Sequence, residues 1–362
     1  NSVSNTYTWT QDDTGPTMVI TSATVDSGSS TNTGAAVFVY TSNEVTTDFA
    51  LVDITVTECV NAGFTTAGNG LVYGSTCTED SNGVTPTVLV AAGAFNDAMG
   101  NDNSVSNTYT WTYDTTSPTI GITSIAGDGY VNEDEYATNG FDVVGSVSGA
   151  NGQTVTVDYG GASATCAAAS GAFTCTFATS VLAAANSGSG VSDSSSPGIT
   201  VTANVDDAAG NSATGASVSI IQDTADPTMT ITSVTVSSGA STTTAAIALT
   251  FTSNEATSNF AAGDITASGC SLGSLTGSST TVYTATCTAS SDGTPSISVA
   301  AGEYTDTAGN GNTVSNTYTW TYDTTGPTMT ITSSTVSSGA STGTAGVALV
   351  FTSNEATSDF AA

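Results

Sequence analysis

The sequence has no lysine, arginine or histidine among its 362 residues, and its 31 Asp and Glu residues give a formal net charge of −31 at pH 7. Without imidazole or amine groups, it lacks the bases and nucleophiles of most hydrolases and of Schiff-base enzymes. Nucleic acids are not expected as partners, because phosphate binding depends on Lys and Arg. The carboxylates also have no side-chain cation with which to pair. They must stay hydrated, accept hydrogen bonds or hold a metal ion.

Long apolar runs are also missing. No stretch approaches the roughly 18 apolar residues of a membrane-spanning helix, so we expect no membrane span in this segment. Only 9% of the residues are charged, all with one sign, which resembles a disordered acidic chain. However, 38% are hydrophobic, and they occur in short alternating runs rich in Val and Thr. This pattern favours folded β-strands over disorder.

An internal repeat organises the chain. The strings SVSNTYTWTQDDTGPTMVITS, SVSNTYTWTYDTTSPTIGITS and TVSNTYTWTYDTTGPTMTITS centre on Trp9, Trp111 and Trp320, and a divergent copy precedes Pro227. The prolines of these strings, Pro16, Pro118, Pro227 and Pro327, follow one another at steps of 102, 109 and 100 residues. Solenoid units usually repeat every 20 to 50 residues, so the longer period indicates whole domains.

The repeat predicts three complete modules: the first module (residues 12–113), the middle module (114–222) and the third module (223–322). We expect residues 1–11 to be the last strand of a preceding domain, and 323–362 to be the incomplete start of a further one.

Each module contains short alternating runs bounded by Gly, Asn, Asp and Pro, as antiparallel strands do. In the third module we predict strands at 228–233, 245–252, 264–267, 281–288, 295–300 and 314–322, with a weak fourth strand after 267. Seven strands in about 100 residues are typical of an immunoglobulin-like sandwich. The predicted fold class is therefore all-β, with tandem immunoglobulin-like β-sandwich domains in a linear array. The middle module, with GDGYVNEDEY after its first strand and a short helical turn predicted in SVLAAANSGSG, is predicted to be a second subtype.

The six cysteines fall into three local pairs: Cys59 with Cys77, Cys166 with Cys175, and Cys270 with Cys287. One pair per module without CxxC spacing indicates disulfides in an oxidising, extracellular setting rather than zinc ligands. We expect the middle pair to close a hairpin, and each outer pair to join a segment near the end of the third strand to the fifth. Closing such loops contributes roughly 3 kcal/mol each in the chain-entropy model.

Three acidic motifs recur. An Asp begins the linker motif D-x-x-x-P, a Glu ends SNE after the second strand, and D-x-x-G-N precedes the last strand. In a seven-stranded sandwich these three places lie at one pole, so the carboxylates of a module should converge. Carboxylate and amide oxygens suit Ca²⁺, which takes six to eight oxygen ligands. Asx-turn chemistry alone would explain the same motifs, so both interpretations stay open.

The candidate ligands include the acidic segment that replaces SNE in the middle module. The full set is Asp12, Glu44, Asp97, Asn101, Asp114, Asn132, Glu133, Glu135, Asp207, Asn211, Asp223, Glu255, Asp306, Asn310, Asp323 and Glu355.

The outer modules resemble one type of the bacterial Ig-like domains repeated in large surface adhesins and biofilm-associated proteins, the type with DTTxPT, FTSNEA, DFAxxDIT, YTATxT and DxAGN in that order. The middle module is similar to a type with GDGYVNEDE, GQTVTV and VTANVDDAAGN. The resemblance covers almost the whole chain. It implies serial sandwiches that act as a stalk at the cell surface, with Ca²⁺ stiffening the linkers in many members. The cysteine pairs and the absence of lysine depart from the family pattern.

The predicted function is a structural, non-enzymatic stalk of an extracellular adhesin or fibre, made rigid by Ca²⁺ and disulfides. Its partners would be neighbouring Ig-like domains of the same chain. One alternative is a subunit of a self-assembling filament or sheath, in which other copies are also partners. Another is a carbohydrate- or ice-binding module, which would use exposed tryptophans or threonine arrays. A role for Trp9, Trp111 and Trp320 in the core or at a domain junction is the favoured interpretation.

Overall fold

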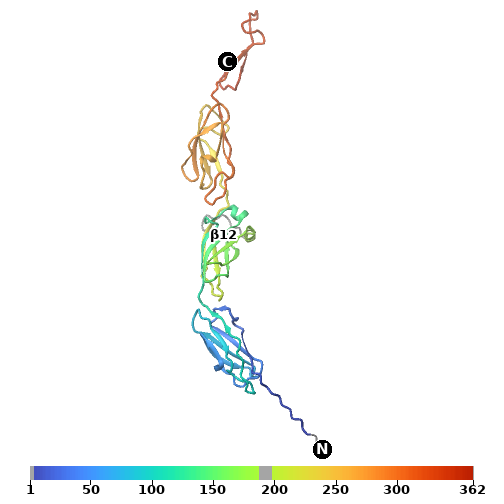
Figure 1. Ribbon diagram of the computed structural model, residues 1–362. Helices are drawn as coiled ribbons and strands as arrows, with labels where there is room; N and C mark the ends of the chain where they lie inside the picture. The colour runs from blue at the N-terminus through green and yellow to red at the C-terminus, as the bar shows by residue number, and fades with distance from the viewer. Residues whose placement is uncertain (1–3, 187–197, 362) are drawn as a thin grey trace. The chain divides into compact units, whose positions relative to one another are not determined.

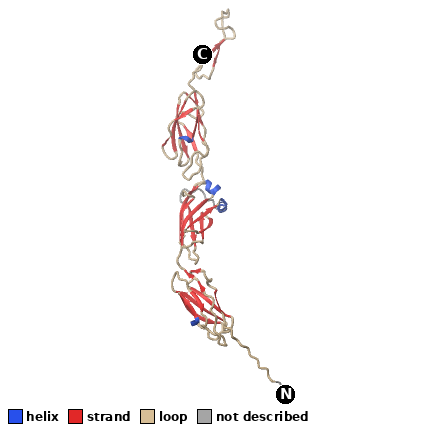
Figure 2. Ribbon diagram, viewed as in Figure 1, coloured by secondary structure: helices blue, strands red, loops and turns tan. Residues whose placement is uncertain are grey.

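The computed structural model describes residues 4–186 and 198–361 (Figure 1). The chain divides into two compact units, Asn1–Thr224 and Ala225–Ala362, and each is described by itself. Strands dominate both units, whereas helical segments are few and short (Figure 2). No helix within the described ranges is long and apolar enough to cross a membrane. The predicted all-β class is confirmed.

The first module consists of two antiparallel sheets that share one core. The sheets have the strand orders β1-β3-β6-β5 and β4-β7-β8. Side chains alternate along β3, where Ala36, Phe38 and Tyr40 are buried between exposed neighbours, as the period of two requires. The elements are β1 (Met18–Ser22), β2 (Ser30–Thr31), β3 (Ala35–Ser42), η1 (Leu51–Asp53), β4 (Ile54–Thr57), β5 (Cys59–Thr66), β6 (Val72–Glu79), β7 (Thr87–Val90), β8 (Tyr109–Thr110) and β9 (Thr112–Tyr113).

The third module repeats this arrangement, with the orders β18-β20-β24-β22 and β21-β25-β26. Its elements are β18 (Met229–Thr232), β19 (Ser241–Thr242), β20 (Ala246–Ser253), η3 (Ala262–Asp264), β21 (Ile265–Ser268), β22 (Cys270–Leu272), β23 (Thr276–Gly277), β24 (Val282–Ala289), β25 (Ser296–Val299), β26 (Tyr318–Thr319) and β27 (Thr321–Tyr322). The strands predicted for this module are confirmed to within one residue at each end, except the last, which is broken into β26 and β27. After this module, β28 (Met329–Thr332) pairs with β29 (Val350–Ser353).

The middle module distributes its strands differently, in the orders β10-β12-β15 and β11-β17-β16-β13-β14. Its elements are β10 (Thr119–Ile125), β11 (Tyr130–Val131), the π-helix η2 (Asp134–Asn139), β12 (Phe141–Ser148), β13 (Thr154–Tyr159), β14 (Ala162–Ala167), β15 (Ala172–Phe177), α1 (Thr179–Asn186), β16 (Ile199–Val205) and β17 (Ala216–Gln222). Here β14 pairs with β13, whereas its counterparts β5 and β22 pair with β6 and β24. The second subtype thus transfers one strand from one sheet to the other.

A short parallel pairing closes each module. β2 pairs with β9, β11 with β17 and β19 with β27, each over two residues. The linker aspartates extend these pairings: the N–H groups of Asp114, Asp223 and Asp323 donate to the carbonyls of Thr31, Val131 and Thr242. Each linker therefore starts from a main-chain position fixed by the module before it.

Each module has its own apolar core. Trp111 and Trp320 are only 1% and 0% exposed and lie in the cores of the first and third modules, whereas Trp9 is 77% exposed. The core interpretation is therefore confirmed for two of the three tryptophans. Residues 4–11, expected to be a last strand, form no strand in the described chain.

All three disulfides join the predicted cysteine pairs. In the outer modules the bond links adjacent strands of one sheet, β5 to β6 and β22 to β24. The predicted hairpin between Cys166 and Cys175 is wrong. β14 and β15 follow each other through a tight turn but belong to opposite sheets, so this disulfide joins the two layers of the sandwich.

Candidate metal centre

The D-x-x-G-N motif forms a closed turn. Asp97 is 5% exposed, and its Oδ1 accepts the N–H groups of Met99 and Asn101 at 2.8 and 2.9 Å. Its Oδ2 accepts the side-chain amide of Asn101 at 2.9 Å. Gly100 adopts φ +87°, which explains the glycine of the motif. The same turn recurs around Asp207 and Asp306.

These hydrogen bonds favour the ionised form of Asp97 and Asp207. Bonds from the side chain and backbone of Asn101 hold the pKa of Asp97 below its ordinary value, although burial opposes the shift. Burial raises the pKa of Asp207, but the bonds from Asn211 and the turn N–H groups outweigh it and the net shift is downward. Folding therefore favours the charged form of both side chains.

We predict that Asp207 makes the stability of the middle module depend on acid. A pKa below the ordinary 3.8 gives a contribution that is complete above about pH 4 and is lost as the pH falls through the lower, folded-state value. Asp207→Asn should therefore lower the melting temperature at pH 7 and flatten its fall between about pH 5 and pH 2. Calorimetry over this range measures both effects, and Asp206→Asn, at the exposed neighbouring position, is the control. Equal pH profiles for Asp207→Asn and the unchanged chain would contradict the assignment.

The SNE motif positions its glutamate through the preceding asparagine. Asn43 accepts the N–H of Thr17 at 2.6 Å and donates to Oε1 of Glu44 at 3.2 Å. Asn254 makes the same pair of bonds with Thr228 and Glu255. Asn43 and Asn254 were not among the predicted site residues, although their recurrence in every SNE copy was a visible signal.

The predicted convergence occurs in the first module. Asp12, Glu44 and Asp97 each offer one carboxylate oxygen, and these three atoms lie within 4.8 Å of one another. Asp12 is exposed, Glu44 half-buried and Asp97 buried. Asn101 joins the linker to the turn, because its amide donates to the Asp12 carbonyl at 3.2 Å as well as to Asp97. Asn101, predicted as a ligand, thus uses its amide nitrogen to orient two other residues.

The donor set fits a hard divalent cation. Three carboxylates supply oxygen ligands, and the remaining positions of a Ca²⁺ shell are commonly filled by carbonyls and water. The sequence contains no side-chain cation that could neutralise the cluster. Like charges this close repel one another, and a bound cation would remove that repulsion. Asp12, Glu44 and Asp97 are therefore the residues that would hold the ion.

The other predicted ligands are placed as follows. In the second unit, Glu255 and Asp306 have carboxylate oxygens within 4.8 Å of each other. The side-chain amide of Asn310 donates a hydrogen bond to Asp306. Asp223 belongs to the first unit. Asp323 follows β27 and Glu355 follows β29. Glu133 directly precedes η2.

The middle module uses its acidic segment differently. Asn132 and Glu135 exchange hydrogen bonds, each backbone N–H donating to the other side chain at 3.1 and 3.0 Å. This reciprocal pair spans the residues that lead into η2, whose N-cap is Glu133. Over residues 4–186 and 198–361, Asp114 and Asp207 gather no third carboxylate as Asp12 and Asp97 do. A calcium site here remains a prediction without a matching cluster.

Two polar residues that the sequence did not single out bind the linkers. Asn82 accepts the N–H of Thr115 at 2.6 Å and donates to the Thr116 hydroxyl at 2.7 Å. From the following module, Asn211 donates to the Asp114 carbonyl at 2.8 Å. The linker after the first module is thus bonded from both sides. In the third module, Asp292 accepts hydrogen bonds from the N–H and hydroxyl of Thr324 and from the hydroxyl of Thr325, and those bonds lower its pKa.

Residues 223–322 match the family model described as a bacterial Ig-like domain. Similar solved structures include InvD of Yersinia pseudotuberculosis, which is 13% identical, with coverage of 84% of this chain and 97% of that one and a TM-score of 0.35. Invasin, a bacterial integrin-binding protein, is 16% identical, with coverage of 77% of this chain and 56% of that one and a TM-score of 0.30. The I9–I11 tandem of titin is 10% identical, with 84% and 98% coverage and a TM-score of 0.25.

No curated protein matches the chain. At these identities the solved structures are likenesses of fold alone, so function has to be argued from residues. The resemblance to bacterial Ig-like domain repeats is confirmed, and residues 223–322 form a bacterial Ig-like domain within a tandem of immunoglobulin-like sandwiches.

Proposed function

We propose that this chain is a non-enzymatic stalk or spacer segment of a bacterial surface adhesin, and that Ca²⁺ stiffens its linkers. The bacterial Ig-like match supports the surface role, and the bacterial integrin-binding protein among the similar structures is consistent with it. Three disulfides suit an oxidising compartment outside the cytoplasm. The absence of Lys, Arg and His removes the usual catalytic groups.

Stiffness is the property that a stalk needs, and the hydrogen bonds of the linker provide part of it. Asn82 and Asn211 bind the segment from Asp114 to Thr116, so its backbone has few torsions left free. A backbone bond from Asn32 to the Ala209 carbonyl adds a direct contact between the first and middle modules. These bonds hold the linker without any charge pair.

The observation that carries the calcium part of the proposal is the meeting of linker Asp12 with Glu44 and Asp97. A cation held there would attach the linker to two loops of the sandwich at once. When bound, Ca²⁺ would supply the positive charge that the sequence lacks. Asn101 and Asn43 would keep two of the carboxylates in place, which lowers the ordering entropy that binding must overcome.

We predict that Ca²⁺ raises the melting temperature of the first module. At a free concentration 100 times the dissociation constant, binding to the native state adds about 2.7 kcal/mol to the free energy of unfolding. Glu44→Gln should remove most of this calcium-dependent increment, because it deletes one charged ligand and keeps the side-chain length. Calorimetry with and without Ca²⁺ measures the increment.

Asp80→Asn is the matched control, since it removes one negative charge from an exposed site outside the cluster. Its calcium increment should equal that of the unchanged chain. Chelation should also shorten the largest dimension of the chain in small-angle scattering. A calcium increment that survives Glu44→Gln in full, or is absent from the start, would refute the proposed site.

A further inference from the structure

The first and third modules close one edge of their sandwich with an asparagine. In the first module, Oδ1 of Asn107 accepts the N–H of Ile20 at 2.8 Å, and its Nδ2 donates to the Ile20 carbonyl at 3.0 Å. Asn316 makes the same two bonds with Ile231 at 2.7 and 3.0 Å. The amide therefore occupies the backbone groups that an edge strand would otherwise present to another chain.

The middle module has lost this closure. The parallel pairings align the two modules, because Thr112 pairs with β2 in the first module and Ile221 pairs with β11 in the middle one. Asn107 lies five residues before Thr112, and the residue five before Ile221 is Ala216. Ala216 is therefore the equivalent of Asn107. The side chain of alanine has no polar atom with which to bind the backbone of Ile122, the counterpart of Ile20. β10 ends its sheet, and β17 pairs with β11 only at Ile221 and Gln222. Among residues 4–186 and 198–361, no strand pairs with the outer edge of Thr119–Ile125 or of Ala216–Ile220. We call the space between these two edges the edge groove.

A pocket of about 260 Å³ lies in the edge groove. In the first module a phenol occupies the equivalent place, where Tyr109 is 6% exposed and its hydroxyl donates to the Val25 carbonyl. The equivalent residue of the middle module is Val218, which is 39% exposed. Ile122 is half-buried, whereas Ile20 is 2% exposed. The smaller valine thus uncovers apolar surface that the tyrosine covers in the first module.

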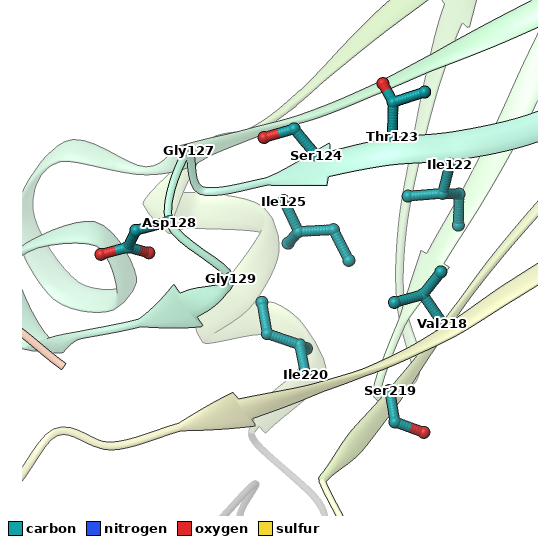
Figure 3. A pocket seen from close by; sticks show the side chains of 10 residues that line it. All are labelled: Ile122, Thr123, Ser124, Ile125, Gly127, Asp128, Gly129, Val218, Ser219 and Ile220. Carbon is teal, nitrogen blue, oxygen red and sulfur yellow. The ribbon is translucent and has the colours of Figure 1, made fainter. Parts of the chain in front are cut away.

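Figure 3 shows the consequence for the side chains. Ile122, Ile125, Val218 and Ile220 extend toward the space between the two strands, while Thr123 and Ser219 point away from it. The floor of the pocket is therefore aliphatic, and its sides are the backbones of two strands. This combination suits an extended peptide, which pairs through its main chain and inserts alternate side chains.

The charge at one end of the edge groove is negative. Asp128 borders the pocket, and its Oδ1 accepts the N–H of Tyr130 at 2.9 Å. Because the chain has no cationic side chain, this end can be neutralised only from outside. A Lys or Arg of the incoming segment would do so.

We propose that the edge groove of the middle module binds an extended segment of a partner protein. The segment pairs with an open strand edge, places one aromatic side chain in the pocket beside Val218, and sets a Lys or Arg next to Asp128. This site is separate from the calcium cluster of the first module and goes beyond the stalk function.

The test uses the full chain at fixed calcium and a fluorescent peptide, Gly-Lys-Val-Thr-Tyr-Thr-Val-Thr-Gly, followed by fluorescence anisotropy. We expect saturable binding in the micromolar range. Replacing the tyrosine of the peptide by serine should weaken binding about tenfold, as loss of a buried ring does, and replacing its lysine by glutamate should weaken it similarly. Hydrogen exchange should show new protection in Ala216–Ile220 or Thr119–Ile125.

The decisive variant restores the closure of the first module: Ala216→Asn with Val218→Tyr. It should weaken peptide binding at least tenfold, whereas Val60→Tyr, at an exposed strand position of the first module, should leave it unchanged. Circular dichroism checks that the double variant folds. If the double variant does not fold, two other measurements test the proposed site. Asp128→Asn should weaken peptide binding about threefold, and hydrogen exchange should place the new protection on the two strand edges.

Three results would overturn the proposal. These are no binding of the tyrosine peptide, equal binding of the tyrosine and serine peptides, which would indicate charge attraction alone, and protection confined to another module.

Discussion

Replacing Trp320 by alanine is expected to lower the free energy of unfolding of the third module by about 3–5 kcal/mol, the range for large aromatic residues in a core. Trp320 is fully buried among the apolar side chains of both sheets. Truncating it leaves a cavity that strands held by their ladders cannot collapse to fill. For a domain of about 100 residues this corresponds to a fall in melting temperature of at least about 12 °C. Trp111→Ala should have a similar effect on the first module.

The repeat supplies the control within the same chain. Trp9 lies in the same TYTWT sequence but is 77% exposed, so Trp9→Ala should change stability by less than about 0.5 kcal/mol. Calorimetry of the three Trp→Ala variants compares the same residue in the same local sequence, once exposed and twice buried. Equal melting of Trp9→Ala and Trp320→Ala would show that local sequence, and not packing, sets the contribution.

The two buried tryptophans differ in one polar contact. The indole N–H of Trp111 donates to Oε1 of Glu79 at 2.8 Å. In the third module Ala289 stands in place of Glu79, as the pairings Cys59–Glu79 and Cys270–Ala289 show. The Nε1 of Trp320 is buried with no acceptor within the described chain. Sequence comparison of the repeats predicts that both rings are buried but not this difference, because the acceptor lies on a distant strand.

The strands were predictable because they depend on local patterns. The alternation in Ala246–Ser253 and its flanking turn residues define β20 without knowledge of its neighbours. The pairing of β14 was not predictable in the same way. A strand that alternates can join either sheet, and the choice depends on which neighbour covers its apolar face. Closure of the sandwich edge by Asn107 was also missed, because its partner Ile20 lies 87 residues away.

The candidate site was predictable to the level of topology. Loops at one pole of a sandwich bring Glu44 and Asp97 near the linker, and the structure places them there. The use of each side chain depends on its rotamer and its hydrogen bonds, which motif spacing does not specify. This is why the hydrogen bonds of Asn101 to its neighbours, and the reciprocal bonds between Asn132 and Glu135, could not be predicted from the motifs.

Removing the disulfide of the third module, by Cys270→Ala with Cys287→Ala, is expected to lower its free energy of unfolding by about 3 kcal/mol. The bond closes a loop with a sequence separation of 17, and the chain-entropy model assigns about this value to such a loop. The melting temperature should fall by roughly 12–24 °C. Replacing both cysteines avoids leaving one reactive thiol, and the melting of the reduced, unchanged chain is the control.

The same bonds should determine how the chain lengthens under load. When a module is pulled open with its disulfide intact, the loop between the cysteines stays outside the path of the force. At about 3.3–3.6 Å per residue, less the Cα–Cα distances of 5.6, 5.7 and 5.1 Å across the bonds, separations of 18 and 17 in the outer modules withhold roughly 50–59 Å each. The separation of 9 in the middle module withholds roughly 25–27 Å.

Single-molecule pulling should therefore give longer unfolding extensions after the disulfides are reduced. The two outer modules should gain the larger length, and the middle module should gain the smaller one. In the variant Cys270→Ala with Cys287→Ala, the opening of the third module should already be longer by the larger increment before any reductant is added. The other two openings should keep their lengths. If reduction left all three lengths unchanged, the disulfides would not bear on extension. The mechanical part of the stalk proposal would then rest on the linkers alone.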